Sequence, residues 1–180
     1  MKRILVAFTA LFALIFAGCA RDNGAVPDEN AAYPGEKAVG YREKPRGESV
    51  GFEMPEFPGV KFELDDDGLN VLAIADGGEK GLYWGMPVLD VYLADLNGDG
   101  KREICSTAAM GSGIVDERIY AYDYANGKLY ELVDRFGSNY RLELQNGVLF
   151  YVQTPNISGG ETLSAPLTID KMTEIDKAQI

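Results

Sequence analysis

From Gly51 onward, the sequence consists of short apolar or alternating runs separated by turn dipeptides that end in glycine. Asn126-Gly127 and Asn146-Gly147 each lie between two such runs. Asparagine followed by glycine supplies the two positive φ angles of a type I′ turn, so each pair predicts a β-hairpin. No stretch of the chain shows the apolar period of a helix. The pattern therefore predicts antiparallel β structure.

The runs predict an all-β domain of about eight to ten strands, arranged as an antiparallel sandwich or a strongly bent sheet. Asp67-Gly68 separates the first two runs, and Asp76-Gly77 precedes the third. The strands are expected at residues 60–64, 70–75, 82–84, 88–94, 103–109, 118–124, 128–133, 140–145, 148–153 and 161–169.

Residues 49–180 are predicted to form a single β domain, because about 130 residues suffice for one ordinary core and not for two. Cys105 lies in an apolar stretch and is predicted to be a small buried hydrophobe. Tyr120, Tyr122 and Tyr124 alternate along one strand and so share a face. This arrangement favours packing in the core over stacking on sugar rings.

Residues 1–19 have the layout of an export signal. Lys2 and Arg3 precede an apolar run from Ile4 to Phe16, and small residues follow before Cys19. The run is shorter than the ~20 residues that a membrane-spanning helix needs. The segment is therefore predicted to be a cleaved signal peptide.

The quartet Phe16-Ala17-Gly18-Cys19 resembles the lipobox of bacterial lipoproteins, with Phe16 where that family usually has leucine. The resemblance implies a lipoprotein signal peptide and a diacylglycerol on the Cys19 thiol, with fatty acyl chains such as palmitate. Two acyl chains suffice for stable anchoring, so the expected location is the extracytoplasmic face of the cell membrane or outer membrane. The alternative is an ordinary signal peptide that happens to contain a cysteine.

Residues 20–48 are predicted to be a flexible tether. They are mostly small, charged or turn-forming, they include Pro27, Pro34 and Pro45, and they show no regular apolar period. Such a segment buries too little surface to offset the entropy lost on ordering. It should hold the domain at a variable distance from the membrane.

Charge and composition narrow the function classes. The formal net charge is −11, and removal of residues 1–19, which contain Lys2 and Arg3 but no acidic residue, makes it −13. Nucleic-acid binding depends on a basic surface, so the negative net charge argues against nucleic acid as a partner. It favours the binding of divalent cations. The sequence has no histidine, which excludes Ser-His-Asp and Cys-His catalysis and His-ligated metals.

Residues 95–103 have the spacing of a calcium loop, D-x-N-x-D-G-x-x-E. Oxygen side chains at the first, third and fifth positions can converge on one cation, and the glycine at the sixth permits a sharp turn. The expected ligands are the side-chain oxygens of Asp95, Asn97, Asp99 and Glu103 and the backbone carbonyl of Lys101. A structural Ca²⁺ is predicted, because turn preference alone does not explain the carboxylate at the ninth position.

The loop is not an EF-hand, because the twelfth position is Ser106 and the flanks are typical of strands. It resembles the strand-loop-strand calcium loops of FG-GAP and VCBS-type repeats. The motif occurs once, so a multi-bladed propeller is not implied. The alternative is a hairpin loop that is rich in Asp, Asn and Gly because turns favour them.

A longer resemblance covers most of the chain after Met54. The runs that carry it lie at residues 54–59, 84–87, 91–103, 111–116, 122–126 and 134–135. They resemble a domain of uncharacterised Firmicutes lipoproteins and the extracytoplasmic tails of membrane sensors similar to β-lactam-sensing transducers. The resemblance implies a binding or sensory role and names no ligand.

Taken together, these features predict a membrane-anchored lipoprotein whose calcium-stabilised domain binds an envelope protein or glycan. The prediction leans away from an enzyme, because no catalytic constellation is visible. An alternative is a carboxylate-dependent hydrolase of envelope glycans, since the separation of two carboxyl groups is not readable from sequence. A purely structural lipoprotein is a third possibility.

Overall fold

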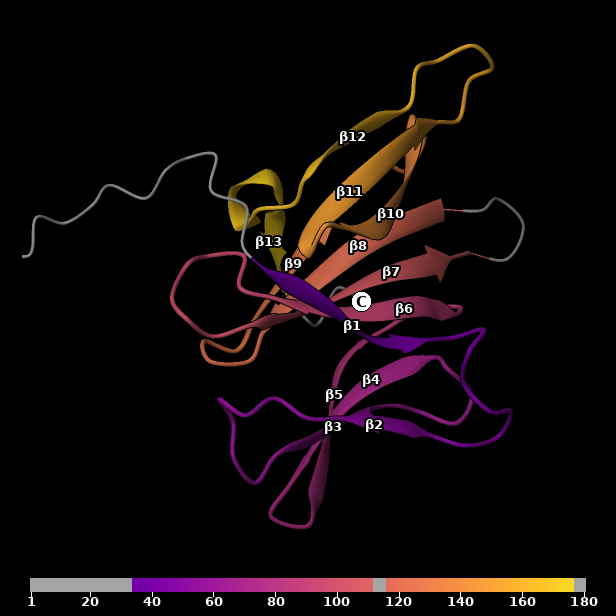
Figure 1. The fold of residues 1–180 in the computed structure, drawn as a ribbon. Coiled ribbons are helices and arrows are strands. Elements are labelled where there is room, and N and C mark those ends of the chain that lie inside the picture. Colours follow the sequence, from indigo (N-terminus) through magenta and orange to yellow (C-terminus); the bar gives the residue numbers. More distant parts are fainter. Residues whose placement is uncertain (1–33, 112–115, 177–180) are drawn as a thin grey trace, which may run out of the picture.

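The structure is a computed structural model, and it describes residues 34–111 and 116–176 (Figure 1). These residues form thirteen strands and one short 3-10 helix. Every predicted run overlaps a strand, so the all-β class is confirmed. The additional strands are β1 (Gly35–Gly40), which lies outside the predicted domain, and the three-residue strands β2 (Val50–Phe52) and β13 (Thr173–Ile175). No helix among the described residues is long and apolar enough to span a membrane.

The central layer is a six-stranded antiparallel sheet in the order β1-β6-β7-β8-β9-β13. The loop predicted to bind calcium joins two of its inner strands, β6 and β7. The strands of this sheet are β1 (Gly35–Gly40), β6 (Val88–Ala94), β7 (Glu103–Met110), β8 (Asp116–Asp123), β9 (Lys128–Leu132) and β13 (Thr173–Ile175).

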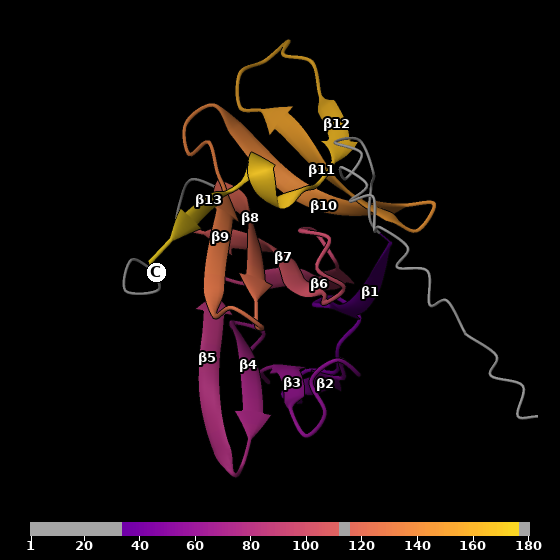
Figure 2. The same ribbon diagram turned by 90° about the vertical axis from the view of Figure 1, so that its left-hand side faces the viewer.

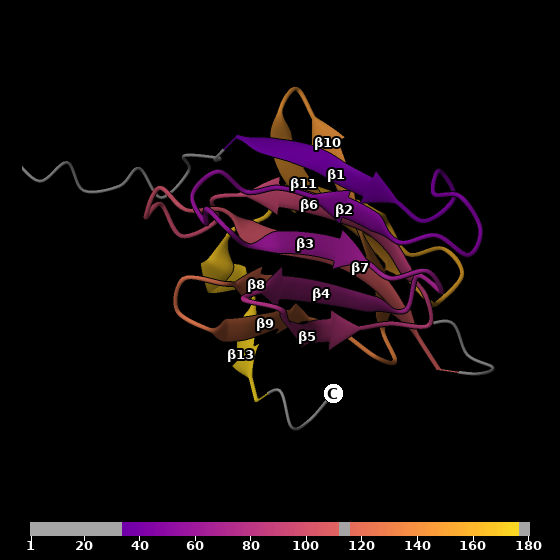
Figure 3. The ribbon, with the colours of Figure 1, turned by 90° about the horizontal axis from the view of Figure 1, so that it is seen from below.

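Two smaller sheets lie on opposite sides of the central one, as the two perpendicular views show (Figures 1 and 2). The view from below shows the four-stranded sheet, ordered β2-β3-β4-β5, across one face (Figure 3). Its strands are β2 (Val50–Phe52), β3 (Lys61–Leu64), β4 (Asn70–Ala75) and β5 (Gly78–Trp84). The three-stranded sheet contains β10 (Ser138–Gln145), β11 (Val148–Pro155) and β12 (Leu163–Pro166), and the 3-10 helix η1 (Ile169–Lys171) follows it.

Alternation along the central strands creates two hydrophobic cores. On β8, Tyr120 and Tyr122 belong to the core shared with the four-stranded sheet, whereas Ile119 and Ala121 belong to the core shared with the three-stranded sheet. This division follows from strand geometry, because successive side chains point to opposite faces. Cys105 is fully buried in the second core. Both tyrosines and the cysteine are therefore core residues, as predicted.

Strand β1 lies inside the segment predicted to be a flexible tether, residues 20–48. It pairs with β6 from Gly35↔Ala94 to Gly40↔Asp90, and its Val39 is buried. The tether prediction is wrong for this strand, because an edge strand with one fully buried apolar side chain shows no clear period. The part of the predicted tether before residue 34 and the predicted signal peptide with Cys19 lie outside the described residues.

One of the two predicted Asn-Gly hairpins differs from the expected turn. Asn146 and Gly147 have φ angles of 52° and 79° and join β10 to β11 as a two-residue turn, as predicted. Between β8 and β9, however, the loop spans residues 124–127, and only Gly127 has a positive φ. The carboxylate of Asp123 accepts the Asn126 amide at 2.9 Å and its side-chain NH₂ at 2.7 Å. These bonds favour the longer loop.

Candidate functional site

The segment predicted to bind calcium forms the loop between β6 and β7. The ladder between these strands ends at Ala94↔Glu103, and the loop turns through Gly98 and Gly100, whose φ angles are 75° and 82°. Glycine adopts these left-handed conformations without the steric cost of a Cβ. The flanks are strands, as the comparison with strand-loop-strand motifs predicts, and they bring Asp95 and Glu103 close together at the mouth of the loop.

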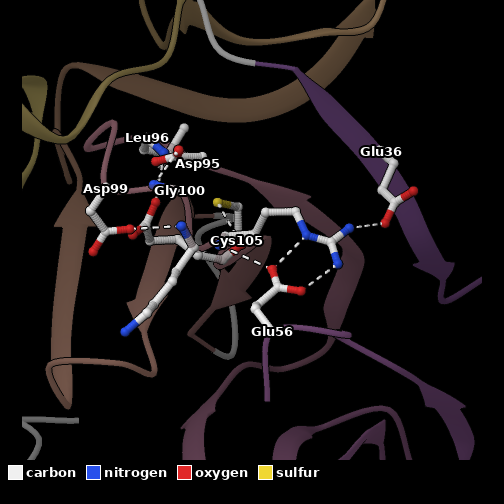
Figure 4. Close-up of polar contacts among 10 residues, drawn as sticks. Glu36, Glu56, Asp95, Leu96, Asp99, Gly100 and Cys105 are labelled. Atoms are coloured by element: carbon white, nitrogen blue, oxygen red, sulfur yellow. Dashed lines mark hydrogen bonds and ion pairs between the residues drawn. The ribbon is translucent and has the colours of Figure 1, made fainter. Parts of the chain in front are cut away.

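Asp95, at the first position of the motif, organises the backbone of the loop. Its Oδ1 accepts the N–H of Gly98 at 2.7 Å. Its Oδ2 accepts the N–H of Gly100 at 2.9 Å (Figure 4). Both carboxylate oxygens therefore face into the loop. This inward orientation is the one that a cation ligand at the first position requires.

Asn97 and Asp99, at the third and fifth positions, also accept backbone N–H groups of the loop. Asn97 Oδ1 accepts the Asp99 N–H at 2.9 Å, and Asp99 Oδ1 accepts the Lys101 N–H at 2.8 Å. The side chain of Lys101 is exposed. A carboxylate or amide oxygen has two lone pairs, so one that accepts an N–H bond still has capacity for a cation.

Glu103, at the ninth position, is buried, with 1 % of its surface exposed. Its Oε2 accepts the Leu96 N–H at 2.6 Å, and its Oε1 accepts the Asn97 side-chain NH₂ at 2.8 Å. The pKa of this carboxyl is raised to about 8, mainly by burial and also by the negative charges of Asp123, Asp95 and Asp99, while the hydrogen bond from Leu96 acts in the opposite direction. The loop thus holds a buried carboxylate among other carboxylates, which is electrostatically unfavourable without a cation.

Asp123, which the sequence did not single out, belongs to this carboxylate group. It lies at the end of β8, beside the start of β7, and is 3 % exposed. Its carboxylate accepts two hydrogen bonds from Asn126, and its negative charge is one of the causes that raise the pKa of Glu103. Neighbouring strands bring the two together, and no spacing rule within a single segment could reveal the contact.

The donor set fits a hard cation in its chemistry, because every predicted ligand atom is an oxygen. Within residues 34–111 and 116–176, no three His, Cys, Asp or Glu side chains gather closely enough to form a ready metal site. In the described form, the loop oxygens are turned to the amides of the loop itself. Convergence on an ion requires Glu103 to share or give up its bond from Leu96.

The raised pKa of Glu103 predicts how the stability of the metal-free protein changes with pH. Its folded-state pKa of about 8 lies above the ordinary value of 4.5, so the folded protein binds more protons than the unfolded chain between those two pH values. This contribution to stability is present below pH 4.5 and is lost as the pH rises towards 8. Glu103→Gln should therefore lose less stability than wild type between pH 5 and pH 8, as measured by urea unfolding.

The control for this experiment is Glu143→Gln, which changes a carboxyl on β10 whose side chain is 39 % exposed. The control should keep the wild-type difference between the two pH values. An identical difference for wild type and Glu103→Gln would show that the buried carboxyl does not titrate in this range.

Arg102, the eighth residue of the motif, connects the loop to two distant segments. Its Nε donates to Glu56 Oε1 at 2.7 Å, its Nη2 donates to Glu56 Oε2 at 2.8 Å, and its backbone N–H reaches Glu56 Oε1 at 3.2 Å. Its Nη1 donates to Glu36 on β1 (Figure 4). The hydrogen bond with Arg102 lowers the pKa of Glu56 to about 2.

A second polar cluster lies on β8 and β9, away from the loop. The Arg118 guanidinium donates to Asp116 and, at 2.6 Å, to Glu131 Oε1. The side chains of Arg118, Asp116 and Glu131 are 15 %, 8 % and 13 % exposed. Burial alone would lower the pKa of Arg118, but its bonds to the two carboxylates raise it overall. The cluster is a largely buried ion triad.

No protein-family model, curated protein or solved structure matches this chain. The resemblances to lipoprotein signals and to FG-GAP-type loops therefore stay predictions from the sequence. The contacts of the β6–β7 loop, of Arg102 and of Arg118 are the observations from which a function can be inferred.

Proposed function

We propose that this protein is a lipid-anchored extracytoplasmic lipoprotein whose β domain is stabilised by Ca²⁺ in the loop Asp95–Glu103. Its role is to bind or sense an envelope component, either a protein or a glycan. The anchor part of the proposal rests on the lipobox-like quartet that ends at Cys19. The calcium part rests on the loop.

The observation that carries the calcium proposal is the series of alternating oxygen side chains on a loop between two strands. Asp95 accepts the N–H groups of Gly98 and Gly100, so both of its carboxylate oxygens are turned to the loop. Asn97 and Asp99 each accept the N–H two residues ahead. A loop of this length could form turns with many sequences. The D-x-N-x-D-G spacing between two strands supports a calcium loop.

The second support is electrostatic. Glu103 is buried, and its negative neighbours include Asp95, Asp99 and Asp123. Burying a carboxylate beside like charges is costly unless a cation or a proton offsets it. A divalent cation bound to these oxygens would remove that cost and would favour the ionised form of Glu103.

Calcium suits this donor set better than magnesium. Ca²⁺ accepts six to eight oxygen ligands in flexible geometry, whereas Mg²⁺ demands a near-ideal octahedron and gives up its water reluctantly. The loop offers three side chains within five residues and a fourth from the next strand. Such a set is adaptable and not rigidly octahedral.

Thermal unfolding of the full-length protein in detergent tests this proposal. Calcium sites in extracellular modules commonly have Kd values of about 10⁻⁴ to 10⁻³ M. Free Ca²⁺ at ten times Kd stabilises the folded state by about 1.4 kcal/mol. For a domain of this size, the expected rise in Tm over chelator is roughly 3 to 6 °C. Magnesium at the same concentration should raise Tm by less.

Asp99→Ala is the matched variant for this experiment. Within the loop, the Asp99 side chain bonds only to the Lys101 N–H and is exposed, so the variant should fold. Its Tm in chelator should be close to that of wild type, and its response to calcium should be lost. A wild-type Tm that is equal in chelator and in millimolar calcium would contradict the proposal and would show that the loop is an ordinary hairpin turn.

The alternative function, a carboxylate-dependent hydrolase of envelope glycans, has less support. Asp116 and Glu131 are two largely buried carboxylates on either side of the Arg118 guanidinium, and both accept hydrogen bonds from it. A general acid and a nucleophile or base need to be available to the sugar. Their pairing with one guanidinium favours a structural role for this cluster.

A further inference from the structure

The segment between β2 and β3 is held to the metal loop by one side chain. Arg102 forms a two-pronged ion pair with Glu56 and also donates its backbone N–H to the same carboxylate. The paired side chains are 24 % and 16 % exposed, so water screens them only in part. Bidentate arginine–carboxylate pairs are among the stronger hydrogen-bonded contacts in proteins. The contact with Glu36 adds less, because the Glu36 side chain is 60 % exposed.

Glu56 is followed directly by an aromatic residue that bridges two sheets. The Phe57 ring lies 6.3 Å from Phe62 on β3 and 4.9 Å from Tyr124 in the β8–β9 loop, in edge-to-face geometry in both cases. Phe62 and Tyr124 also contact each other, at 5.0 Å. Glu56 is therefore adjacent in the chain to a ring that packs against Phe62 of the four-stranded sheet and against Tyr124 of the β8–β9 loop.

Apart from the apolar packing of Met54, Phe57 and Val60 against the first core, the same segment has few contacts that fix its backbone. Its internal backbone bonds are those of a turn, from Phe57 N–H to the Met54 carbonyl at 2.9 Å and from Val60 N–H to the Phe57 carbonyl at 3.2 Å. Residues 53–60 are not part of any strand. Met54 is buried, but Glu53, Pro55, Pro58 and Gly59 are exposed. The Arg102 ion pair is thus the main polar contact between this segment and the central sheet.

We propose that residues 53–60 form a latch, that Arg102 closes it over the Phe57–Phe62–Tyr124 cluster, and that a cation in the β6–β7 loop holds it closed. The proposal rests on the calcium proposal above and adds a consequence to it. Arg102 lies between Lys101 and Glu103, two of the proposed ligands, so an ion that fixes those residues also fixes the backbone from which the guanidinium extends. Without the ion, the loop and the latch can open together.

Hydrogen exchange of the full-length protein in detergent, in calcium and in chelator, tests this coupling. The reporters are the Phe57 and Val60 amides, which are bonded only within the latch. At ten times Kd, exchange through openings that release the ion should slow by up to about elevenfold. Amides of the loop, such as Gly98 and Gly100, report occupancy of the loop separately.

The outcomes separate the latch from the metal site. Slower exchange in calcium at both the loop and the latch supports the coupling. Slower exchange at the loop with unchanged latch amides would overturn the latch and leave the calcium proposal intact. Unchanged exchange at both, with no calcium-dependent rise in Tm, would overturn both proposals.

Two variants test whether Arg102 carries the coupling. Arg102→Lys keeps the charge but loses the two-pronged geometry, and Glu56→Gln removes the charge from the opposite side. In both, calcium should still slow exchange at the loop and should slow the latch amides by less than about twofold. Arg141→Lys is the matched control, because among the described residues Arg141 forms its ion pair with its near neighbour Glu143 on β10. A wild-type latch response in both Arg102→Lys and Glu56→Gln would show that another contact closes the latch.

Discussion

Replacing Arg118 with alanine is expected to lower the free energy of unfolding by about 3 to 5 kcal/mol, since Glu131 loses the guanidinium that it bonds to and Asp116 keeps only the exposed Arg135, at 3.9 Å. Asp116 and Glu131 each accept a hydrogen bond from Arg118, and all three side chains are at most 15 % exposed. For a domain of this size, a loss of 3 kcal/mol corresponds to a fall in Tm of roughly 10 °C. Urea unfolding at neutral pH measures the change.

The control for Arg118 is Arg141→Ala. Arg141 also pairs with a carboxylate, but its side chain is 56 % exposed, so its loss should change stability by less than about 1 kcal/mol. Replacing the whole triad, with Asp116→Asn, Arg118→Met and Glu131→Gln together, should recover much of the lost stability, because no uncompensated charge remains. Equal stability of Arg118→Ala and wild type would mean that water reaches the cluster.

Replacing Cys19 with serine is expected to abolish lipidation and to move the protein from the detergent phase to the aqueous phase. The hydroxyl of serine cannot form the thioether that the lipobox resemblance implies. Two acyl chains give stable anchoring, whereas one chain gives an association constant of only about 10⁴ M⁻¹. Phase partitioning and intact mass measure the loss.

Cys105→Ala is the matched control for the anchor, because Cys105 is the second cysteine of the chain and is buried in the second core. This variant should remain in the detergent phase with the mass of the lipidated protein. Partitioning of Cys19→Ser into detergent at the wild-type level would contradict the assignment of the anchor.

The elements that the sequence predicted are those whose signal is local. The apolar alternation of β8 and the Asn146-Gly147 turn are each contained within a few residues, and the structure has both. Strand β1 was not predicted, because its sequence shows no apolar alternation and Val39 is its one buried apolar residue. Its pairing with β6 makes it a strand, and that pairing cannot be read from the sequence of β1 itself. The prediction of a two-residue turn at Asn126-Gly127 was wrong, because the Asp123 carboxylate accepts the Asn126 N–H and favours a longer loop.

The hydrogen bonds within the loop are local, whereas the contacts that link it to other strands and segments are not, and these could not be predicted from the sequence. The motif predicted a loop between two strands, and Asp95, Asn97 and Asp99 do lie in the loop between β6 and β7, where each accepts a backbone N–H. It could not reveal Asp123 beside Glu103, because that contact crosses from β7 to β8. The Arg102–Glu56 pair joins residues 46 positions apart, and only the packing of the two sheets brings them together.

Calorimetric titration of the full-length protein with calcium tests the central claim most directly, because it measures binding itself and not its effect on stability. Wild-type protein freed of metal by chelator should bind one Ca²⁺ with a Kd of about 10⁻⁴ to 10⁻³ M. Asp99→Ala, measured in the same way, should show no binding heat in that range. No heat in wild type, or an identical isotherm in Asp99→Ala, would contradict the assignment of the β6–β7 loop as a calcium site.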